Sequence, residues 1–459
     1  MMNGGNDGKV EVAKTTFSGK LTTVLVAAGC SVGLGNIWRF PYVAGENGGG
    51  AFVLLYLACI VIIGLPVMLS EFAVGRSTQM SAVGAYKQLD RGAGRWKWLG
   101  YNGVFAAFVV MGFYFVVAGW TAEYFVFSAT GELAKYTSVE SYSRLFSSFV
   151  SNPWRPLIFT WIFIAMSHAI IHLGVEKGLE RVSKLLMPLL FMILIILSVN
   201  SLLMPGSWEG VKFFISPDFS KITPQVVLQA VGQAFFSLSV GLGALVAYGS
   251  YIPQGANLRT TALQVTLLDT SVAIIAGLII FPACFSVGIS PASGPALVFE
   301  TLPAIFNTLP FSSLWATIFF LLLIIAALTS TMSLHEVTTV YFIEEWGISR
   351  KNGAILTSII VGALGTVASL SMGVWSGFTI AGMNLFNLFD YVTANIMLPL
   401  GGLLTCIFVG YRMDRKIVES QITNGGAYGN DYFRVMIFLL RYVCPIVIFV
   451  IFLDSIGVL

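Results

Sequence analysis

Long apolar runs separated by short polar segments dominate the pattern of this chain. A run of about 20 apolar residues is long enough to cross a bilayer as a helix. Eleven such runs can be placed, near 18–43, 51–75, 98–130, 155–172, 181–204, 224–253, 260–287, 311–345, 353–371, 384–411 and 432–455. The pattern therefore predicts an all-α polytopic membrane protein with eleven transmembrane helices.

One pentapeptide, SVGLG, occurs at 31–35 and again at 239–243, in each case inside a long apolar run. Glycine costs about 1 kcal/mol relative to alanine in a helix interior, so both runs are predicted to leave the helix there. Freed backbone groups are tolerated in a bilayer only where protein or a polar cavity satisfies them. Paired interruptions in two halves of a chain indicate the substrate and ion site of a secondary transporter.

The distribution of lysine and arginine predicts the orientation. With the N-terminus inside, eighteen of these residues fall in cytoplasmic segments and five in outer ones, as the positive-inside rule requires. An odd number of spans then places the C-terminus outside, and the two pentapeptides are antiparallel. We therefore expect a cytoplasmic segment at 1–17, inverted repeats at 18–204 and 224–411 joined by an extracellular loop at 205–223, a cytoplasmic loop at 412–431 and a final span within 432–459.

The connecting segments carry further expectations. The outer loops 131–154 and 288–310 are long enough to form lids. In the second loop, helix-breaking residues alternate with apolar ones from 290 onward, which suggests a re-entrant hairpin. The cytoplasmic stretch 417–431, rich in glycine and asparagine, is interpreted as a plain loop.

Composition agrees with a membrane protein: 56% of residues are hydrophobic and 10% charged, against about a quarter charged in soluble domains. The net charge of +3 gives no indication of nucleic-acid binding. Five cysteines without CxxC spacing indicate packing residues. No nucleophile elbow, phosphate loop or metal-hydrolase signature is present, so we do not expect an enzyme.

Ionisable residues inside spans are costly and are functional candidates. Arg39 and Asp390 enter the membrane from the same side and are either a pair that closes over a solute or two unrelated interfacial residues. Asp269, near the middle of its span, is satisfied either by a bound cation or as a protonated packing acid. Glu71 and Glu336 are expected to hold backbone N–H groups that the broken helices free.

Sodium prefers oxygen ligands, which carbonyls, hydroxyls and amides of unwound helices supply. Side chains of this kind occur near the breaks: Ser31, Asn36, Ser237, Ser239, Thr329 and Ser330. From the residues alone, Thr329 and Ser330 are interpreted as packing within a membrane helix, since such hydroxyls bond to the preceding turn. His168 and His172 are spaced i, i+4 but lack a third ligand, so they are interpreted as interfacial, and His335 as isolated.

Several motifs resemble the neurotransmitter:sodium symporter family. They are GLGNIWRFPY at 33–42, ENGGGAF at 46–52, GLP at 64–66, EFAVGR at 71–76, GQAFFSLS at 232–239 and AALTS at 326–330. The likeness covers nearly the whole chain, and its eleven-span form resembles bacterial members that carry hydrophobic amino acids. It implies a LeuT-type 5+5 inverted repeat with unwound first and sixth helices in the cell membrane.

The resemblance implies two sodium sites. The first sodium site would use the Ser31 carbonyl and the side chains of Asn36, Ser237 and Asp269. The second sodium site would use the carbonyls of Gly29, Val32 and Ala326 with the hydroxyls of Thr329 and Ser330. This reverses the packing interpretation of those two hydroxyls. Many animal members have asparagine where this chain has Asp269 and require chloride, so chloride independence is expected.

The substrate site implied by the resemblance has a polar and an apolar part. The substrate carboxylate would meet sodium, the amides of Leu34 and Gly35 and the Tyr114 hydroxyl, as helix-end amides favour an anion. Its ammonium would bind groups around Cys30, Phe236 and Ser239. Members that carry monoamines have aspartate where this chain has Gly33, so an amino acid is expected. The side-chain pocket would comprise Val110, Phe236, Leu242, Ser330 and Leu334.

Gates follow from the same resemblance. The outer gate would be Phe236 beneath Arg39 and Asp390. The inner gate would place Lys14 and Phe17 against Tyr251 and Glu344. Lysine lacks the bidentate fork of arginine, which predicts a weaker inner gate than in relatives that have arginine there.

The function expected is import of a large aliphatic or aromatic L-amino acid by alternating access with two sodium ions. Two alternatives remain. An amino-acid-gated channel or sensor would use the same pocket without accumulating substrate. A proton-coupled carrier would rely on Asp269 and would not need sodium.

Overall fold

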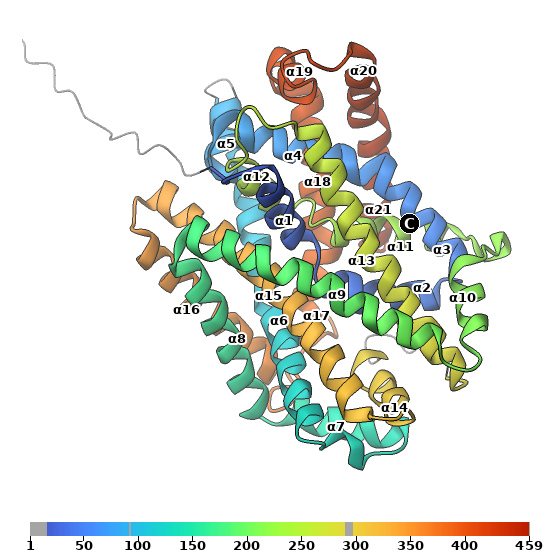
Figure 1. Ribbon diagram of the computed structural model, residues 1–459. Helices are drawn as coiled ribbons and strands as arrows, with labels where there is room; N and C mark the ends of the chain where they lie inside the picture. Colours follow the sequence, from blue (N-terminus) through green and yellow to red (C-terminus); the bar gives the residue numbers. More distant parts are fainter. Residues whose placement is uncertain (1–15, 91–92, 290–296, 459) are drawn as a thin grey trace, which may run out of the picture.

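The computed structural model describes residues 16–90, 93–289 and 297–458, and its regular secondary structure is helical throughout these ranges (Figure 1). The only β pairing in them is two isolated bridges, between Gly49 and Pro217 and between Ile380 and Met383. Apolar side chains from nearly every helix form one continuous core. The expected all-α class is therefore confirmed.

The first half of the chain contains the elements α1 (Lys20–Ser31), η1 (Gly35–Arg39), α2 (Phe40–Glu46), α3 (Gly50–Cys59), η2 (Ile60–Gly64), α4 (Leu65–Thr78), α5 (Ala82–Leu89), α6 (Lys97–Ala129), η3 (Leu133–Lys135), α7 (Val139–Ser151), α8 (Arg155–His172), η4 (Val175–Glu180), α9 (Arg181–Leu202) and α10 (Ser207–Ile215). Pro41, Pro66 and Pro156 lie in the first turns of α2, α4 and α8. At the start of α8 the missing N–H of proline costs no helical hydrogen bond. α2 and α4 continue η1 and η2 without a gap, so Pro41 and Pro66 lie inside continuous helical stretches.

The second half contains η5 (Phe219–Lys221), α11 (Pro224–Ser237), α12 (Ala244–Gly249), α13 (Leu258–Ser286), α14 (Thr301–Asn307), α15 (Ser312–Trp346), α16 (Arg350–Leu370), α17 (Leu385–Tyr391), η7 (Val392–Met397), α18 (Leu398–Ile407), η8 (Phe408–Arg412), α19 (Arg415–Ile422), α20 (Asn430–Phe438), η9 (Leu439–Val443) and α21 (Cys444–Ser455). Several starts are capped by side chains: Thr223, Asn257 and Ser349 accept bonds from the first turns of α11, α13 and α16. Such caps satisfy orphan N–H groups of the helix ends.

Within the described ranges, nine continuous helical stretches are long and apolar enough to cross a membrane. α1 and the η1–α2 segment form a further span, bent by 55° at the first SVGLG copy. α11 and α12 are separated by 238–243, which contains the second copy. Both predicted interruptions are therefore confirmed. The count of eleven spans and their orientation remain predictions.

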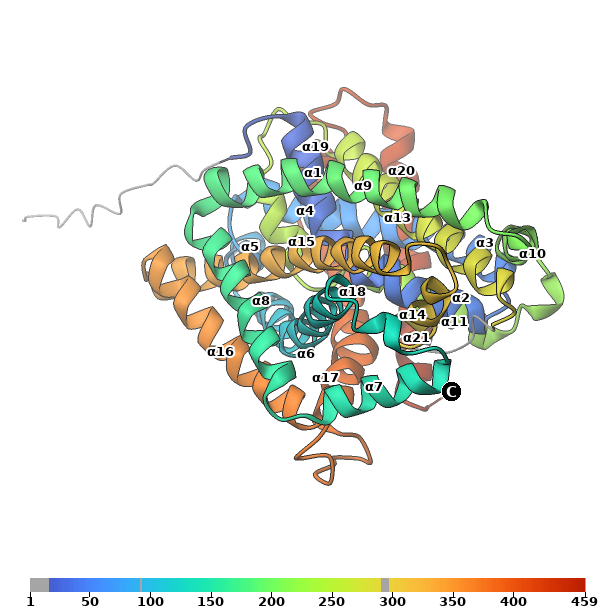
Figure 2. The same cartoon turned by 60° about the horizontal axis from the view of Figure 1, so that its bottom comes forward.

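Two long helices, α6 and α15 with 33 and 35 residues, pack along each other at the centre of the molecule. α8 and α16 pack beside them (Figure 2), whereas α4, α12 and α13 form a second group next to α1 (Figure 1). α19 and α20 lie at one end of the molecule and α7 and α14 at the other (Figure 1). The two broken spans lie between these helix groups.

The loop predictions had mixed outcomes. Segment 131–154 forms η3 and α7, and α7 packs on α14 from the second long loop. The suggested hairpin at 290–295 lies outside the described residues. The interpretation of 417–431 as a plain loop was wrong, because α19 extends to Ile422. This segment is helical because α19 packs against α4. There the buried Arg76 donates to the Gln421 side chain at 2.5 Å and to the Gln421 carbonyl at 3.1 Å.

Candidate functional site

The two breaks lie against each other and are joined by reciprocal hydrogen bonds. Ser31, the last residue of α1, donates its hydroxyl to the carbonyl of Leu238 at 3.3 Å. Ser239 donates to the carbonyl of Cys30 at 3.1 Å. In a bilayer such carbonyls have no water to bond, so each unwound segment satisfies groups that the other frees.

The second break is held open by three residues with positive φ, namely Ser239 at 55°, Gly241 at 87° and Gly243 at 67°. Glu71 on α4 accepts the N–H of Gly241 at 2.8 Å. This confirms the prediction that Glu71 holds a backbone group freed by a broken helix. The prediction was wrong for Glu336, which binds Arg350 and accepts the Tyr251 hydroxyl at 2.7 Å.

We expect Gly241→Ala to abolish substrate binding and lower thermal stability. A Cβ at this position would lie 2.4 Å from the backbone carbonyl oxygen of Leu398, and its φ of 87° disfavours any L side chain. Gly255→Ala is the matched control, since its Cβ would meet no atom within 4 Å. Ligand binding and unfolding temperature of both purified variants test this, and wild-type binding by Gly241→Ala would contradict it.

A buried polar cluster lies directly behind the breaks. Asp269 on α13 is completely buried. One carboxylate oxygen accepts the Asn36 amide N–H at 2.8 Å, and the other accepts the Ser237 hydroxyl at 2.7 Å. Within the described residues Asp269 has no lysine or arginine within 4 Å, unlike Glu336 with Arg350. A buried carboxylate surrounded only by neutral dipoles is suited to a small cation.

The same cluster contains contacts that the sequence did not reveal. Tyr56 on α3 donates to the Ser237 hydroxyl at 3.1 Å, and Gln233 donates to the Gly35 carbonyl at 3.1 Å. The Asn36 amide presents its nitrogen to Asp269 because its oxygen accepts the N–H of Gly33 at 3.1 Å. A half-turn of this amide would present oxygen to a cation instead. No local motif marks Tyr56, since only the fold brings it to Ser237.

The five residues of the predicted second sodium site meet where α1 contacts α15. The carbonyl of Val32 accepts the Ser330 hydroxyl at 3.1 Å and the Thr329 hydroxyl at 3.3 Å. Thr329 also donates to Ala326 at 3.0 Å. Gly29 is adjacent, since a Cβ on it would lie 3.6 Å from Cβ of Thr329. The hydroxyls therefore face the end of α1 as well as their own helix.

An apolar cavity adjoins both clusters. It is lined by Cys30, Ser31, Gly33, Gly35, Val110, Tyr114, Phe236, Ser239, Leu242, Ser330, Leu334 and Leu398. Of the predicted substrate residues only Leu34 is absent from this lining, and its N–H donates to the Tyr114 hydroxyl at 2.9 Å. Sequence reasoning missed Leu398, which η7 and the following α18 bring to the cavity.

A second cavity, here called the outer cavity, adjoins the first at Phe236, which lines both. Arg39 lies over the Phe236 ring, 4.5 Å from its centroid, and Asp390 lines the same space. Among the described residues the two form no ion pair within 4 Å, so the direct pair, one of the two alternatives for these residues, is not formed in this structure. Aromatic residues that the sequence did not single out form the wall: Trp38, Tyr42, Phe113, Trp120, Phe146 and Phe386.

On the opposite side, the chain that enters α1 packs against Tyr251. Phe17 donates its N–H to the Tyr251 carbonyl at 2.9 Å, and the two rings lie 5.5 Å apart. Glu344 accepts the N–H of Ser81 at 2.5 Å. Lys14, the remaining member of the predicted inner gate, lies outside the described residues.

The three histidines lie together, which the sequence interpretation of an isolated His335 missed. The His168 ring is 5.9 Å from His172 and 6.0 Å from His335. His335 bonds to Ser167 at 3.2 Å. In the part of the chain that the structure describes, no group of three or more His, Cys, Asp or Glu residues could hold a metal. These histidines pack α8, α15 and α16 together.

Known proteins resemble this chain throughout its length. The model of the sodium:neurotransmitter symporter family matches residues 14–145 and 147–459. An uncharacterised sodium-dependent transporter of Bacillus subtilis, YhdH, is 38% identical over 96% of this chain and 98% of its own. The sodium- and chloride-dependent GABA transporter 2 of rat is 28% identical over 85% of this chain and 71% of its own. The crystal structure of MhsT in complex with L-phenylalanine superposes with a TM-score of 0.89 at 41% identity, covering 96% of this chain and all of MhsT.

Proposed function

The chain belongs to the sodium:neurotransmitter symporter family, and from this premise we propose that it imports a neutral hydrophobic L-amino acid together with two sodium ions and without chloride. As a member of this family with the LeuT-type fold, it is a multi-pass membrane transporter and not an enzyme. Sodium is the coupling ion of the family. The substrate, the number of ions and the independence from chloride are our proposal.

One observation carries the proposal. The buried Asp269 carboxylate, with Asn36 and Ser237, lies beside two interrupted helices that also border an apolar cavity. A sodium ion at Asp269 would add positive charge to the N–H groups near Leu34 and Gly35. These groups favour an anion, so an amino acid carboxylate is suited to the same place. Bound substrate and bound sodium would then each raise the affinity for the other, which is the basis of coupling between them.

The cavity lining supports a hydrophobic side chain. Val110, Leu242 and Leu334 contribute aliphatic surface, and Phe236 covers its outward side. No lysine, arginine, aspartate or glutamate lines this cavity within the described residues. MhsT, which shares this fold at 41% identity, was crystallised with L-phenylalanine, and this supports the same substrate class here.

The mechanism that follows is alternating access. Phe236 with Arg39 and Asp390 forms the outer gate, and Phe17 with Lys14, Tyr251 and Glu344 forms the inner one. The Phe17 and Tyr251 contact and the outward cavity at Asp390 support this division. Inward movement of sodium contributes about 2.3 kcal/mol per charge for each 100 mV of membrane potential, which is sufficient to concentrate substrate.

Thr329→Val is expected to raise the sodium concentration for half-maximal binding about 10-fold while leaving stability without sodium nearly unchanged. Valine retains the shape of threonine but removes the hydroxyl, and each tenfold change in affinity corresponds to about 1.4 kcal/mol. Thr331→Val is the control, because its hydroxyl bonds only to Leu328 of the same helix in the described structure. Equal sodium titrations for the two variants would favour the packing interpretation.

Equilibrium binding tests the substrate assignment. Purified protein in detergent should bind L-phenylalanine and L-leucine in sodium chloride and equally in sodium gluconate, but not in potassium chloride. GABA, which lacks an apolar side chain, should not compete. Sodium-dependent binding of GABA in preference to both amino acids would overturn the proposed substrate class.

A further inference from the structure

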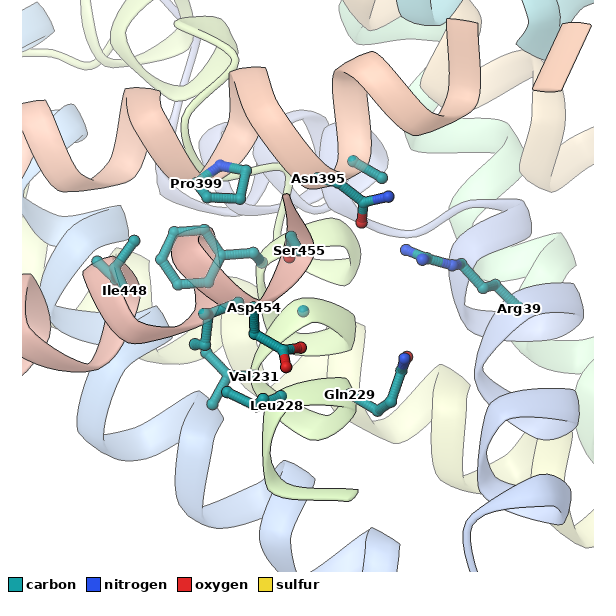
Figure 3. A pocket seen from close by; sticks show the side chains of 13 residues that line it. Arg39, Leu228, Gln229, Val231, Asn395, Pro399, Ile448, Asp454 and Ser455 are labelled. Carbon is teal, nitrogen blue, oxygen red and sulfur yellow. The ribbon is translucent and has the colours of Figure 1, made fainter. Parts of the chain in front are cut away.

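Arg39 separates two cavities on the side of the molecule outward of Phe236. The first is the outer cavity described above, which contains Asp390. The second, here called the side cavity, lies between α11, η7 with α18, and α21. Arg39 is the only described residue that lines both. Its guanidinium is directed into the side cavity (Figure 3) and also lies against Phe236, which lines the outer cavity.

Each cavity offers this guanidinium one carboxylate. Asp390 lies in the outer cavity and Asp454, near the end of α21, in the side cavity. Among the described residues Arg39 has neither carboxylate within 4 Å, and its guanidinium lies over the Phe236 ring instead. An aromatic face attracts a cation, so the Phe236 ring stabilises the guanidinium of Arg39, which lines both cavities.

The side cavity is built to receive a guanidinium. Figure 3 shows Arg39, Gln229, Asn395 and Asp454 directed into one space, with Val231, Leu228, Pro399 and Ile448 on its other walls. Two amide oxygens and a carboxylate match the five N–H donors of arginine. The apolar walls strengthen such contacts because they lower the local dielectric constant.

Arginine remains charged in proteins, so its acceptors must be replaced whenever a partner withdraws. Opening of the proposed outer gate would separate Arg39 from Asp390. We propose that Asp454 is a positioning residue of this gate, which holds the Arg39 guanidinium in the side cavity while the gate is open and releases it to Asp390 on closure. This inference rests on the proposed function, because it assigns the alternating gate to Arg39.

Thiol accessibility in the outer cavity tests the switch. Met372→Cys places a reporter in its lining, and all five native cysteines are buried. In this background Asp454→Asn should slow alkylation by a membrane-impermeant reagent about fivefold, the lower end of ordinary coupling between sites. Asp390→Asn should accelerate it, and Asp454→Glu should retain the parent rate. The matched control Asp431→Asn removes an exposed carboxylate at the other end of the same helical stretch and should change nothing.

The decisive comparison uses Arg39→Gln. If Asp454 acts through Arg39, Asp454→Asn has no further effect on alkylation in that background. If Asp454→Asn lowered the alkylation rate equally with and without Arg39, Asp454 would have a merely structural role and the proposal would be overturned. An unchanged alkylation rate in Asp454→Asn alone would overturn it as well. Alkylation requires no transport, so it is independent of sodium-dependent L-phenylalanine binding, whose absence from the parent would instead overturn the proposed function.

Discussion

Asp269→Asn is expected to lower sodium affinity in chloride-free medium about 100-fold, a change of about 2.7 kcal/mol, and to make transport depend on chloride. The carboxylate is completely buried and accepts only from neutral groups, at 2.8 Å from Asn36 and 2.7 Å from Ser237. Asparagine preserves its shape but removes the negative charge that would face the cation. An external anion could then restore the charge balance of the site.

Sodium titrations of binding in chloride and in gluconate measure this effect. Glu123→Gln is the control, because it removes another buried carboxylate, one paired with Arg155 at 2.5 Å. It should leave the sodium titration unchanged in both salts. Tight sodium binding by Asp269→Asn in gluconate would show that the carboxylate does not supply the negative charge at the sodium site. The proposed independence from chloride would then need another explanation.

Gly33→Ala is expected to weaken substrate binding at least about 100-fold, or about 2.7 kcal/mol, in a protein that still folds. A Cβ here would lie 2.2 Å from the Ser330 hydroxyl oxygen and 2.7 Å from the Tyr114 hydroxyl oxygen. Both side chains would have to move. Ser330 would lose its bond to the Val32 carbonyl, and Tyr114 its bond from the Leu34 N–H. The methyl group would also occupy the cavity at the position proposed for the substrate carboxylate.

Binding isotherms for L-phenylalanine, with size-exclusion profiles as a check of folding, measure this effect. Gly255→Ala is the matched control, because its added Cβ would have no atom within 4 Å and it lines none of the three cavities described above. A Gly33→Ala variant that binds as tightly as Gly255→Ala would place the substrate elsewhere.

Much of the fold could be predicted because the bilayer restricts the choices. Uninterrupted apolar runs predicted the long helices, and the repeated SVGLG predicted where two of them break. The role of Glu71 at the Gly241 N–H followed from the same reasoning, since a freed donor in a membrane must find an acceptor. In these cases the local sequence and the need to satisfy backbone hydrogen bonds in a bilayer lead to the same prediction.

Features that depend on long-range docking could not be predicted from local sequence. α19 forms where Gln421 meets the buried Arg76, which lies on a distant helix. Glu336 pairs with Arg350, and His335 approaches His168, because α8, α15 and α16 pack together. The place of Arg39 in the lining of two cavities, one with Asp390 and the other with Asp454, likewise emerges only when α21 is placed against α11.

The most direct test of the account is uptake into proteoliposomes. Labelled L-leucine, L-tyrosine and L-tryptophan are supplied with an inward sodium gradient or with equimolar potassium, each as chloride or gluconate. We predict concentrative uptake that requires sodium and is equal in both anions. Uptake that continues unchanged in potassium would contradict the sodium sites at Asp269 and Thr329 and favour a proton-coupled carrier, and sodium flux without accumulation would favour an amino-acid-gated channel.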